Sequence, residues 1–485
     1  MANARFLIWV VVFLLSDPQF LCGAPAVHMA NGVKIGEVTK DSARVWTRLT
    51  RNPERTRSDW AFLNTDRSRF NDPTWDGTDQ LPFGLPLDAM DGAVPGASGE
   101  TRVVYWVDGE TTAARVTPWE SVDPARDFTR QVSLADLQPG SAYRFRAEGR
   151  AAGGGDTLVS IEGGFRTAPA RSDAEEVRFA VVTCGDYPRR DDPVNGHQIY
   201  QVLAQEIQPD FLVHAGDIEY FDKPEPWAPS VALARFKFNR LYAMPNFLAF
   251  HNHFASYWMK DDHDTLRNDC WPGQHFGSLT WEEGLAVFPE QFPVSAPTYR
   301  TFRWGKDLQI WLMEGRDYRS PNRMPDGPAK TIWGVEQKRW LFETMQYSDA
   351  TFRVLLSPTP IVGPDRESKN DNHANRGFEL EGTEVRQFLS AMDNTIVICG
   401  DRHWQYASVD DETGLREFAC GPSSNEHAGG FPNRPEPEHR YLRIGGGFLT
   451  ATVSPEGPTL TVRHHDVKGV VKNETVIQAA PGFGF

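Results

Sequence analysis

The sequence predicts a mainly parallel α/β domain that follows a smaller β-sandwich. At 485 residues the chain exceeds what one hydrophobic core usually serves, so two domains are expected. From residue 177 onward, apolar runs end in polar residues, which is typical of parallel strands buried on both faces. Before residue 170, short alternating segments are separated by turn residues, a pattern that favours an antiparallel sandwich.

The first domain is expected over residues 25–170. Two short strands are predicted within 32–49, and further strands at 102–107, 128–132, 137–147 and 160–167. The pattern Leu137-x-Pro-Gly-x-x-Tyr-x-Phe145, followed by Phe165-Arg-Thr167, resembles a fibronectin type III or related immunoglobulin-like module. A polar stretch rich in Pro and Asp, from about 51 to 99, is interpreted as an insertion, and 168–173 as a linker.

The N-terminus has the pattern of a signal peptide over residues 1–24. Arg5 precedes an apolar run of about ten residues, too short for the ~20 residues that span a bilayer. Small residues follow this run, where a signal peptidase would cut. We therefore expect an exported protein, periplasmic or secreted, with no membrane span once the signal is removed.

The acidic composition argues against a broad nucleic-acid-binding face. The formal net charge is −15, whereas nucleic-acid binding requires an excess of Lys and Arg on at least one surface. An acidic protein that binds an anionic substrate needs a local source of positive charge, and bound metal ions usually provide it. The widely spaced Cys184, Cys270, Cys399 and Cys420 exclude a disulfide scaffold. We expect a monomer that acts on a small molecule.

Four polar motifs follow apolar runs that are predicted to be strands. The expected strands are at 177–184, 211–217, 308–314, 352–357 and 395–401, with a helix around 199–207. Such parallel strands carry their functional residues at their carboxyl ends, which meet at one edge of the sheet. The four motifs are Thr183-Cys-Gly-Asp186, Ala215-Gly-Asp-Ile-Glu-Tyr220, Lys260-Asp-Asp-His-Asp-Thr-Leu-Arg-Asn268 and Cys399-Gly-Asp-Arg-His403. Their side chains can bind hard cations.

The order and spacing of these motifs resemble the calcineurin-like metallophosphoesterases. Cys184, Tyr220 and Gly400-Asp-Arg-His403, together with Glu314-Gly-Arg-Asp-Tyr-Arg319, are departures that resemble the alkaline phosphatase D (PhoD-like) family. The segment 36–48 resembles the N-terminal domain of that family. The resemblance implies a four-layer αββα catalytic domain over 175–485, ending in a β-hairpin, and hydrolysis of phosphate monoesters or diesters.

The resemblance also implies the metals and their ligands. Fe(III) would be held by Cys184, Asp217, Tyr220 and His403, and a phenolate suits this ion. Asp217 would bridge to Ca²⁺, which would also bind Asp401 and a residue of the third motif. Asn268 is the preferred residue there, and Asp262 is the alternative.

The expected chemistry is direct attack on phosphorus by a hydroxide that the metal pair activates. His263 is the candidate to protonate or hydrogen-bond the leaving group. Arg316 and Arg319 are candidates to bind phosphate oxygens in a bidentate fork.

Two other functions fit parts of the sequence. Purple acid phosphatases also combine a β-sandwich with Gly-Asp-x-x-Tyr, but would have Asp at position 184 and Gly-His-x-His as the last motif. A secreted binding protein on a degenerate hydrolase fold would lack some ligands. The polar segment 365–375 is either a surface loop or a loop that folds over the site. His464 and His465 alternate faces in the terminal hairpin and are predicted at the surface.

Overall fold

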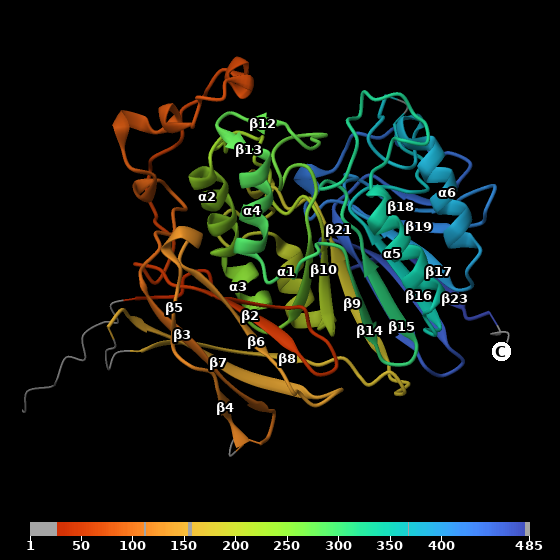
Figure 1. Cartoon of the computed structure of the whole chain (residues 1–485), viewed down its shortest axis with the longest axis horizontal. Coiled ribbons are helices and arrows are strands. Elements are labelled where there is room, and N and C mark those ends of the chain that lie inside the picture. Colours follow the sequence, from red (N-terminus) through yellow and green to blue (C-terminus); the bar gives the residue numbers. More distant parts are fainter. Residues whose placement is uncertain (1–26, 111–112, 154–157, 367, 481–485) are drawn as a thin grey trace, which may run out of the picture.

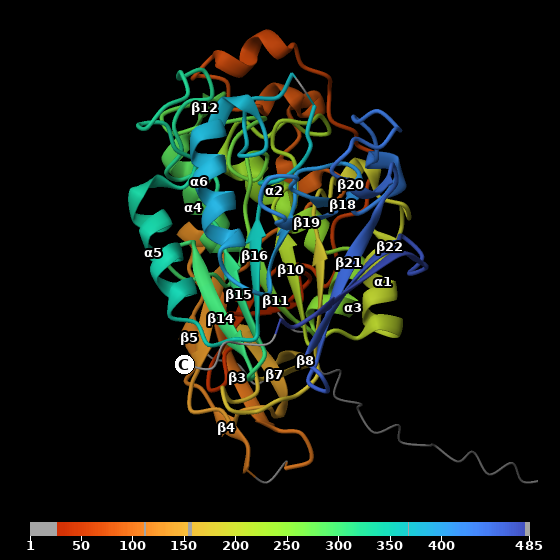
Figure 2. The same ribbon diagram turned by 90° about the vertical axis from the view of Figure 1, so that its right-hand side faces the viewer.

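Two large β-sheets pack face to face, and helices cover their outer faces (Figures 1 and 2). This computed structural model describes residues 27–110, 113–153, 158–366 and 368–480. The predicted signal peptide lies outside the described residues. No helix within the described ranges combines the length and the apolar character needed to cross a bilayer.

The first sheet has nine strands in the order β23-β22-β21-β9-β10-β11-β1-β2-β6. Its centre consists of parallel strands, as predicted: β9 (Val177–Val182), β10 (Phe211–Ala215) and β11 (Ala255–Met259). One edge is the predicted C-terminal hairpin with one added strand: β21 (Gly447–Ser454), β22 (Thr459–Asp466) and β23 (Val471–Gln478). The other edge is N-terminal: β1 (Val33–Gly36), β2 (Ala43–Arg48) and β6 (Thr129–Leu134).

The N-terminal β-rich region therefore shares a sheet with the catalytic region. Its remaining strands form a separate five-stranded sheet: β3 (Gly99–Val107), β4 (Arg115–Val116), β5 (Glu120–Ser121), β7 (Ala142–Ala151) and β8 (Val159–Arg166). Buried side chains of this sheet and of both large sheets belong to one continuous apolar cluster. The division near residue 170 stays a prediction.

The second large sheet has seven strands in the order β14-β15-β16-β17-β19-β18-β20. The strands are β14 (Arg300–Trp304), β15 (Leu308–Leu312), β16 (Phe352–Ser357), β17 (Thr395–Cys399), β18 (Gln405–Val409), β19 (Arg416–Cys420) and β20 (His439–Arg443). Strands β15, β16, β17 and β19 are parallel neighbours, so their carboxyl ends lie at one edge.

Side chains alternate along each strand between the two faces of its sheet, which explains the four layers of helix, sheet, sheet and helix. In β9, Val181 joins the core between the sheets, whereas Ala180 and Val182 face the outer helices. That outer layer contains α1 (Gln198–Val202), its π-helical continuation 203–207, α2 (Val231–Tyr242), α3 (Pro245–His251) and α4 (Trp281–Gln291). The second sheet is covered by α5 (Gly334–Gln346) and α6 (Glu379–Ser390). The predicted αββα arrangement is confirmed.

The predicted insertion, 51–99, contains four short 3-10 turns that pack beside α2 and the small hairpin β12 (His275–Phe276) and β13 (Leu279–Thr280) (Figure 1). Gln80 exchanges two 2.9 Å hydrogen bonds with the backbone of Trp227. Arg267 donates to the Asn71 side chain at 2.8 Å. The insertion thus supports the loops that follow β10 and β11.

The prediction that His464 and His465 lie at the surface is wrong. Both are buried, because β22 lies between β21 and β23 and both faces of this sheet are covered. His465 stacks on Phe448 beneath the helices, with ring centroids 4.6 Å apart. His464 faces the second sheet, where its Nε2 contacts the backbone oxygen of Tyr406 at 2.9 Å.

Candidate metal centre

Three of the predicted ligands occupy equivalent positions in their strand-end loops. Cys184, Asp217 and Asp401 each lie two residues beyond the end of β9, β10 or β17. All three have left-handed backbones, with φ of 54°, 53° and 59°. This conformation costs of order 1–3 kcal/mol for a residue other than glycine, and such residues cluster at functional sites. Each strand therefore turns sharply and presents its side chain at the sheet edge.

Two glycines allow the loops to approach each other. A Cβ atom on Gly400 would lie only 2.1 Å from the Ala215 backbone oxygen. A Cβ atom on Gly216, which has a φ of 87°, would lie 2.7 Å from the Asp261 Cβ. The glycines of the two Gly-Asp motifs are therefore required for the spacing between the β10, β11 and β17 loops.

Cys184, Asp217, Tyr220 and His403 converge at one point, which we call the cysteine corner. The Tyr220 hydroxyl lies 3.1 Å from Asp217 Oδ2 and 3.2 Å from His403 Nε2. The Cys184 Sγ lies 3.6 Å from the same Asp217 oxygen. Potential ligand atoms of Cys184, Asp217 and His403 all lie within 4.8 Å of one another. The structure thus brings together all four residues predicted to hold the first cation.

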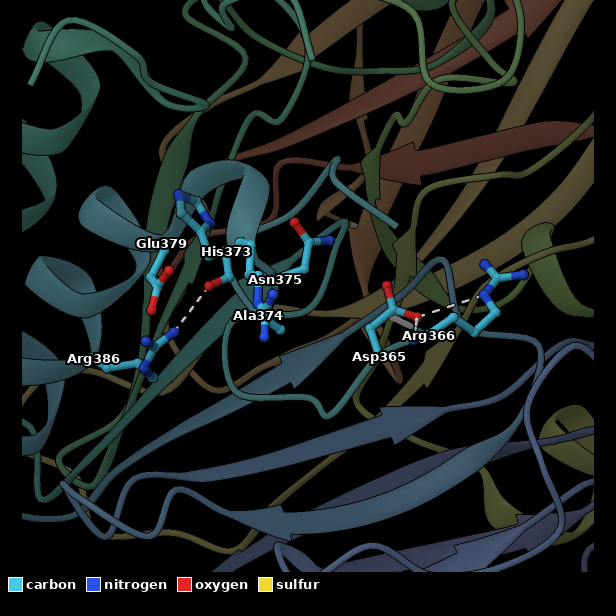
Figure 3. Close-up of a pocket in the computed structure, with 8 residues that line it drawn as sticks. Asp365, Arg366, His373, Ala374, Asn375, Glu379 and Arg386 are labelled. Atoms are coloured by element: carbon cyan, nitrogen blue, oxygen red, sulfur yellow. Dashed lines mark hydrogen bonds and ion pairs between the residues drawn. The ribbon is translucent and has the colours of Figure 1, made fainter. Parts of the chain in front are cut away.

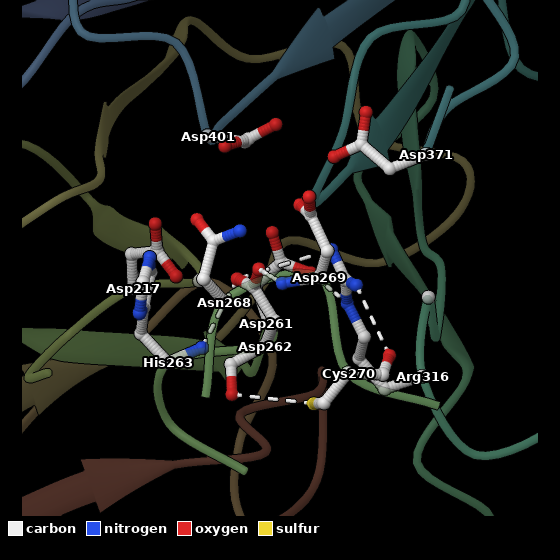
Figure 4. A network of polar contacts seen from close by, with 12 residues as sticks. Asp217, Asp261, Asp262, His263, Asn268, Asp269, Cys270, Arg316, Asp371 and Asp401 are labelled. Atoms are coloured by element: carbon white, nitrogen blue, oxygen red, sulfur yellow. Dashed lines mark hydrogen bonds and ion pairs between the residues drawn. The ribbon is translucent and has the colours of Figure 1, made fainter. Parts of the chain in front are cut away.

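Asp217 also belongs to an acidic corner with Asp261 and Asp401 (Figure 4), whose oxygens lie within 4.8 Å of one another. Asp217 Oδ1 and Asp261 Oδ2 are buried and have no hydrogen-bond partner among the described residues. Burial, together with Asp262, Asp261 and Asp264, holds the pKa of Asp217 well above its ordinary value. Buried carboxylate oxygens without hydrogen-bond partners fit a cation site, since a bound cation would interact with them.

The two ligand candidates of the third motif, Asp262 and Asn268, lie in different surroundings. Asp262 accepts hydrogen bonds from two backbone amides of its own loop, those of His263 and Asp269, at 3.0 and 2.5 Å. Its carboxylate also lies in a third group with Asp217 and His263. The Asn268 side chain is exposed and points toward Asp401 (Figure 4). Asp217 is the one residue common to all three groups.

Asp222 holds His263 and Asn268 in position. One Asp222 oxygen lies 2.5 Å from His263 Nδ1, and the other accepts the Asn268 backbone amide at 2.8 Å. Burial lowers the pKa of His263, but the surrounding carboxylates, Asp222 foremost, outweigh it and raise the pKa to about 10. The His263 ring also packs against Tyr220, with centroids 4.2 Å apart. His263 thus lies beside the cysteine corner as an oriented imidazole whose protonated form the neighbouring carboxylates favour.

The two arginines proposed as phosphate ligands lie behind the acidic loop. Arg316 is completely buried, and its Nε donates to Asp261 at 2.5 Å. Arg319 is also buried and donates to the Asn322 side chain and the Asp371 backbone. Arg316 therefore acts on Asp261, since its Nε is bound to that carboxylate and its side chain has no exposed surface with which to meet a substrate.

A buried ion pair supports the backbone of the Gly-Asp-x-x-Tyr motif. Lys237 on α2 and Glu219 have completely buried side chains with 3.6 Å between Nζ and Oε1. Lys237 also donates to the backbone oxygens of Tyr220 and Lys223. Its ammonium group thereby fixes the carbonyl of a predicted metal ligand.

Lys237→Met is expected to lower the free energy of unfolding by about 3–5 kcal/mol, because it leaves the Glu219 charge buried without a partner. Adding Glu219→Gln should recover part of this loss, and denaturant unfolding of the single and double variants measures the coupling. If Lys237→Met lowered the free energy of unfolding equally in the natural protein and in Glu219→Gln, the two side chains would not be coupled.

The polar loop 365–375 reaches the edge of the site. Asp365 accepts a 2.5 Å hydrogen bond from Arg402, the neighbour of Asp401. The loop and the start of α6 line a polar cavity of about 440 Å³ (Figure 3). None of the four cysteine-corner residues lines this cavity. His373 is buried and pairs with Glu381 at 3.0 Å, so it supports the loop instead of facing the metal ligands.

Three residues near the predicted ligands were not assigned to the site from the sequence: Asp222, Asp261 and His427. Asp261 directly precedes Asp262, the carboxylate that the sequence favours as the alternative ligand in the third motif. His427 follows β19, whose carboxyl end lies at the same sheet edge as that of β17. The sequence signal for this residue is weak, since only the short apolar run 418–420 precedes the polar segment 422–427.

Known proteins share this sequence pattern and fold. The family described as PhoD-like phosphatase matches residues 179–443, and its N-terminal domain matches residues 23–169. Alkaline phosphatase D of Bacillus subtilis (strain 168) is 22% identical over 405 residues, which cover 69% of this chain and 66% of that protein. The chain thus matches just under two thirds of that relative's length.

Two solved structures resemble the fold. The structure of PhoD superposes with a TM-score of 0.68 at 18% identity and covers 95% of this chain and 90% of that chain. Purple acid phosphatase PPD1 from seeds of yellow lupin (Lupinus luteus) gives a TM-score of 0.63 at 13% identity, covering 92% and 74%. The structural similarities support the fold, and the family match spans more than half of the residues. The chain belongs to the PhoD-like phosphatase family.

Proposed function

We propose that this protein is an exported, metal-dependent phosphoester hydrolase. The observation that carries the proposal is the overlap of three groups of potential ligands that share Asp217. One group contains a thiol and an imidazole, and another contains only carboxylates. Family membership and the relative named alkaline phosphatase D support the same activity. The substrates are small phosphate monoesters or diesters.

The donor types support two different cations. Cys184, Tyr220, His403 and Asp217 are a set suited to Fe(III), because thiolate and phenolate oxygen are strong anionic donors. The oxygen-rich remainder suits Ca²⁺, held by Asp217, Asp401 and Asn268, with Asp261 as an additional donor beside Asp217. When bound, such a pair polarises the phosphate and provides a nucleophile from water at neutral pH.

The residues around the cations orient the substrate and move a proton. His263, held by Asp222, is the acid that donates to the leaving oxygen. Arg316 fixes Asp261 and balances part of the negative charge of the acidic corner. This assignment replaces the phosphate-binding role that the sequence favoured for Arg316.

Metal analysis combined with hydrolysis tests the proposal. We expect purified protein to contain iron and calcium and to hydrolyse aryl phosphate monoesters or diesters. A chelator should abolish turnover, and calcium added to iron-containing protein should restore it. Purification without iron and without turnover, even after both metals are supplied, would contradict the proposal.

The same measurements separate the alternatives. A purple-acid-phosphatase-like enzyme would not depend on the Cys184 thiol or on calcium. A non-catalytic binding protein would hydrolyse no ester even when fully loaded with metal. Export is tested separately, by the N-terminal sequence of the mature protein.

A further inference from the structure

The polar cavity beside the loop 365–375 contains a group of arginines. Its charged lining residues are Asp365, Arg366, Arg376, Glu379 and Arg386. Arg366 and Arg386 lie at opposite ends of the residues drawn in Figure 3. The chain as a whole has a formal net charge of −15, so a cavity with three arginines is a local exception. Such a concentration of positive charge attracts anions that the rest of the surface repels.

The three arginines differ in how far the fold occupies their guanidinium groups. Arg386 donates to the backbone oxygens of Ile361 and His373 at 3.0 and 2.9 Å, so it supports the cavity wall. Arg376 is exposed, in the 3-10 turn before α6. The Arg366 side chain is 35% exposed, and its Nε is buried without a hydrogen-bond partner in the described structure. Arg366 and Arg376 are therefore the arginines available to an anion.

Asp365 does not occupy Arg366, although the two residues are adjacent. The Asp365 Oδ1 atom accepts hydrogen bonds from Arg402 at 2.5 Å and from the Arg366 backbone amide at 2.7 Å. The Arg366 Nε forms only a longer ion pair with this oxygen, at 3.6 Å (Figure 3). A contact of this length is too long for a hydrogen bond. The Arg366 guanidinium can therefore donate to a bound acceptor without breaking a hydrogen bond to Asp365.

Arg366 also lies beside the loop that presents His403. Its guanidinium carbon is 5.6 Å from the ring centroid of Trp404, the residue after His403. A Cβ atom on Gly430 would lie 3.3 Å from the Arg366 Nη1. The amide of the preceding residue, Gly429, donates to the His403 backbone oxygen at 2.9 Å. The Arg366 end of the cavity thus adjoins the metal centre.

We propose that Arg366 and Arg376 bind a second phosphate group of the substrate, and that the enzyme acts on small organic bisphosphates. The inference rests on the proposed phosphoester hydrolase function. The reacting phosphate belongs to the metal centre, and the cavity takes a different group because none of the cysteine-corner residues lines it. A phosphate group carries a charge of roughly −1.5 to −2 at pH 7, which two guanidinium groups balance, and it accepts hydrogen bonds from their planar forks.

Hydrolysis of paired substrates tests this inference. The probes are the monophosphates and the bisphosphates of short straight-chain diols of increasing length, and the release of inorganic phosphate is measured. For at least one chain length, kcat/KM of the bisphosphate should exceed that of the monophosphate by ~10-fold or more, as expected for hydrogen bonds to a charged group. An analogue with a carboxylate in place of the second phosphate should gain less, because it carries less charge.

Arg366→Gln should lower kcat/KM for the favoured bisphosphate by ~10-fold to 100-fold more than for the matching monophosphate, mainly through a higher KM. Arg366→Lys keeps the charge but loses the planar fork, so its loss should be smaller. Arg416→Gln is the matched control, because Arg416 is also exposed but lies at the start of β19, away from the site edge. It should keep the preference of the natural protein, and thermal unfolding of each variant checks folding.

Two results would overturn the inference. One is an equal kcat/KM for monophosphate and bisphosphate at every chain length. The other is a loss in Arg366→Gln that is the same for both substrates, since a purely structural role of this arginine would affect both alike. Absence of turnover of every ester by metal-loaded natural protein, monophosphates included, would instead contradict the proposed hydrolase function itself.

Discussion

Cys184→Ala is expected to leave a folded protein that lacks iron and has lost at least about 10³-fold in kcat/KM, which corresponds to ~4 kcal/mol of transition-state stabilisation. The Cys184 thiol is completely buried, and burial together with Asp217 raises its pKa well above the ordinary value. Without a cation, this thiol therefore stays protonated and behaves as a small apolar side chain. With the proposed cation bound, it would become a thiolate ligand that alanine cannot replace.

Cys420→Ala is the matched control, because Cys420 is also a completely buried cysteine, at the end of strand β19 in the second sheet. It should reduce stability by about 1 kcal/mol through the small cavity that it leaves, and retain both metal and activity. Metal analysis and turnover of both variants test whether Cys184 binds the metal. Full activity in Cys184→Ala would mean that this cysteine is only a packing residue.

The strands and the edge that they share could be predicted from the sequence. Apolar runs such as 211–215 are long enough and sufficiently β-branched or aromatic to mark buried parallel strands. The rule that such strands present functional residues at their carboxyl ends then places Cys184 and Asp217 at one edge of the first sheet. Asp401 reaches them from the second sheet, which packs against the first. These predictions depend on local pattern and on one topological rule, which is why the structure agrees with them.

Residues whose role depends on neighbours far along the chain could not be predicted in the same way. Asp261 and Asp262 are adjacent and both lie near Asp217, and only the turn of the loop decides that Asp261 joins Asp401 while Asp262 joins His263. Arg316 looked free to bind phosphate because its partner, Asp261, is 55 positions away. His464 and His465 looked exposed because nothing in the hairpin reveals that both faces of its sheet are covered.

Asp217→Asn should have a larger effect than Cys184→Ala, because Asp217 is shared by all three groups of potential ligands. An amide is a weak ligand and cannot bridge two cations, so both metals should be lost. In the natural protein, adding metal should raise the unfolding temperature, since a cation that binds only the folded state stabilises it. In Asp217→Asn this increase should disappear, together with turnover.

With metal bound, the natural protein should be more stable than Asp217→Asn, and removal of metal should reverse this order. The folded-state pKa of Asp217 is raised, so the metal-free natural protein loses stability as pH rises above about 4, where the unfolded carboxyl ionises. The amide has no such penalty, and metal-free Asp217→Asn should therefore be the more stable protein at pH 7. Asp210→Asn, at the opposite end of β10, is the control: it loses one of the two hydrogen bonds that Asp210 accepts from Arg166 and the Arg178 amide, and it should retain its metals. Metal-dependent stabilisation that survives in Asp217→Asn would show that this carboxylate does not bridge the site.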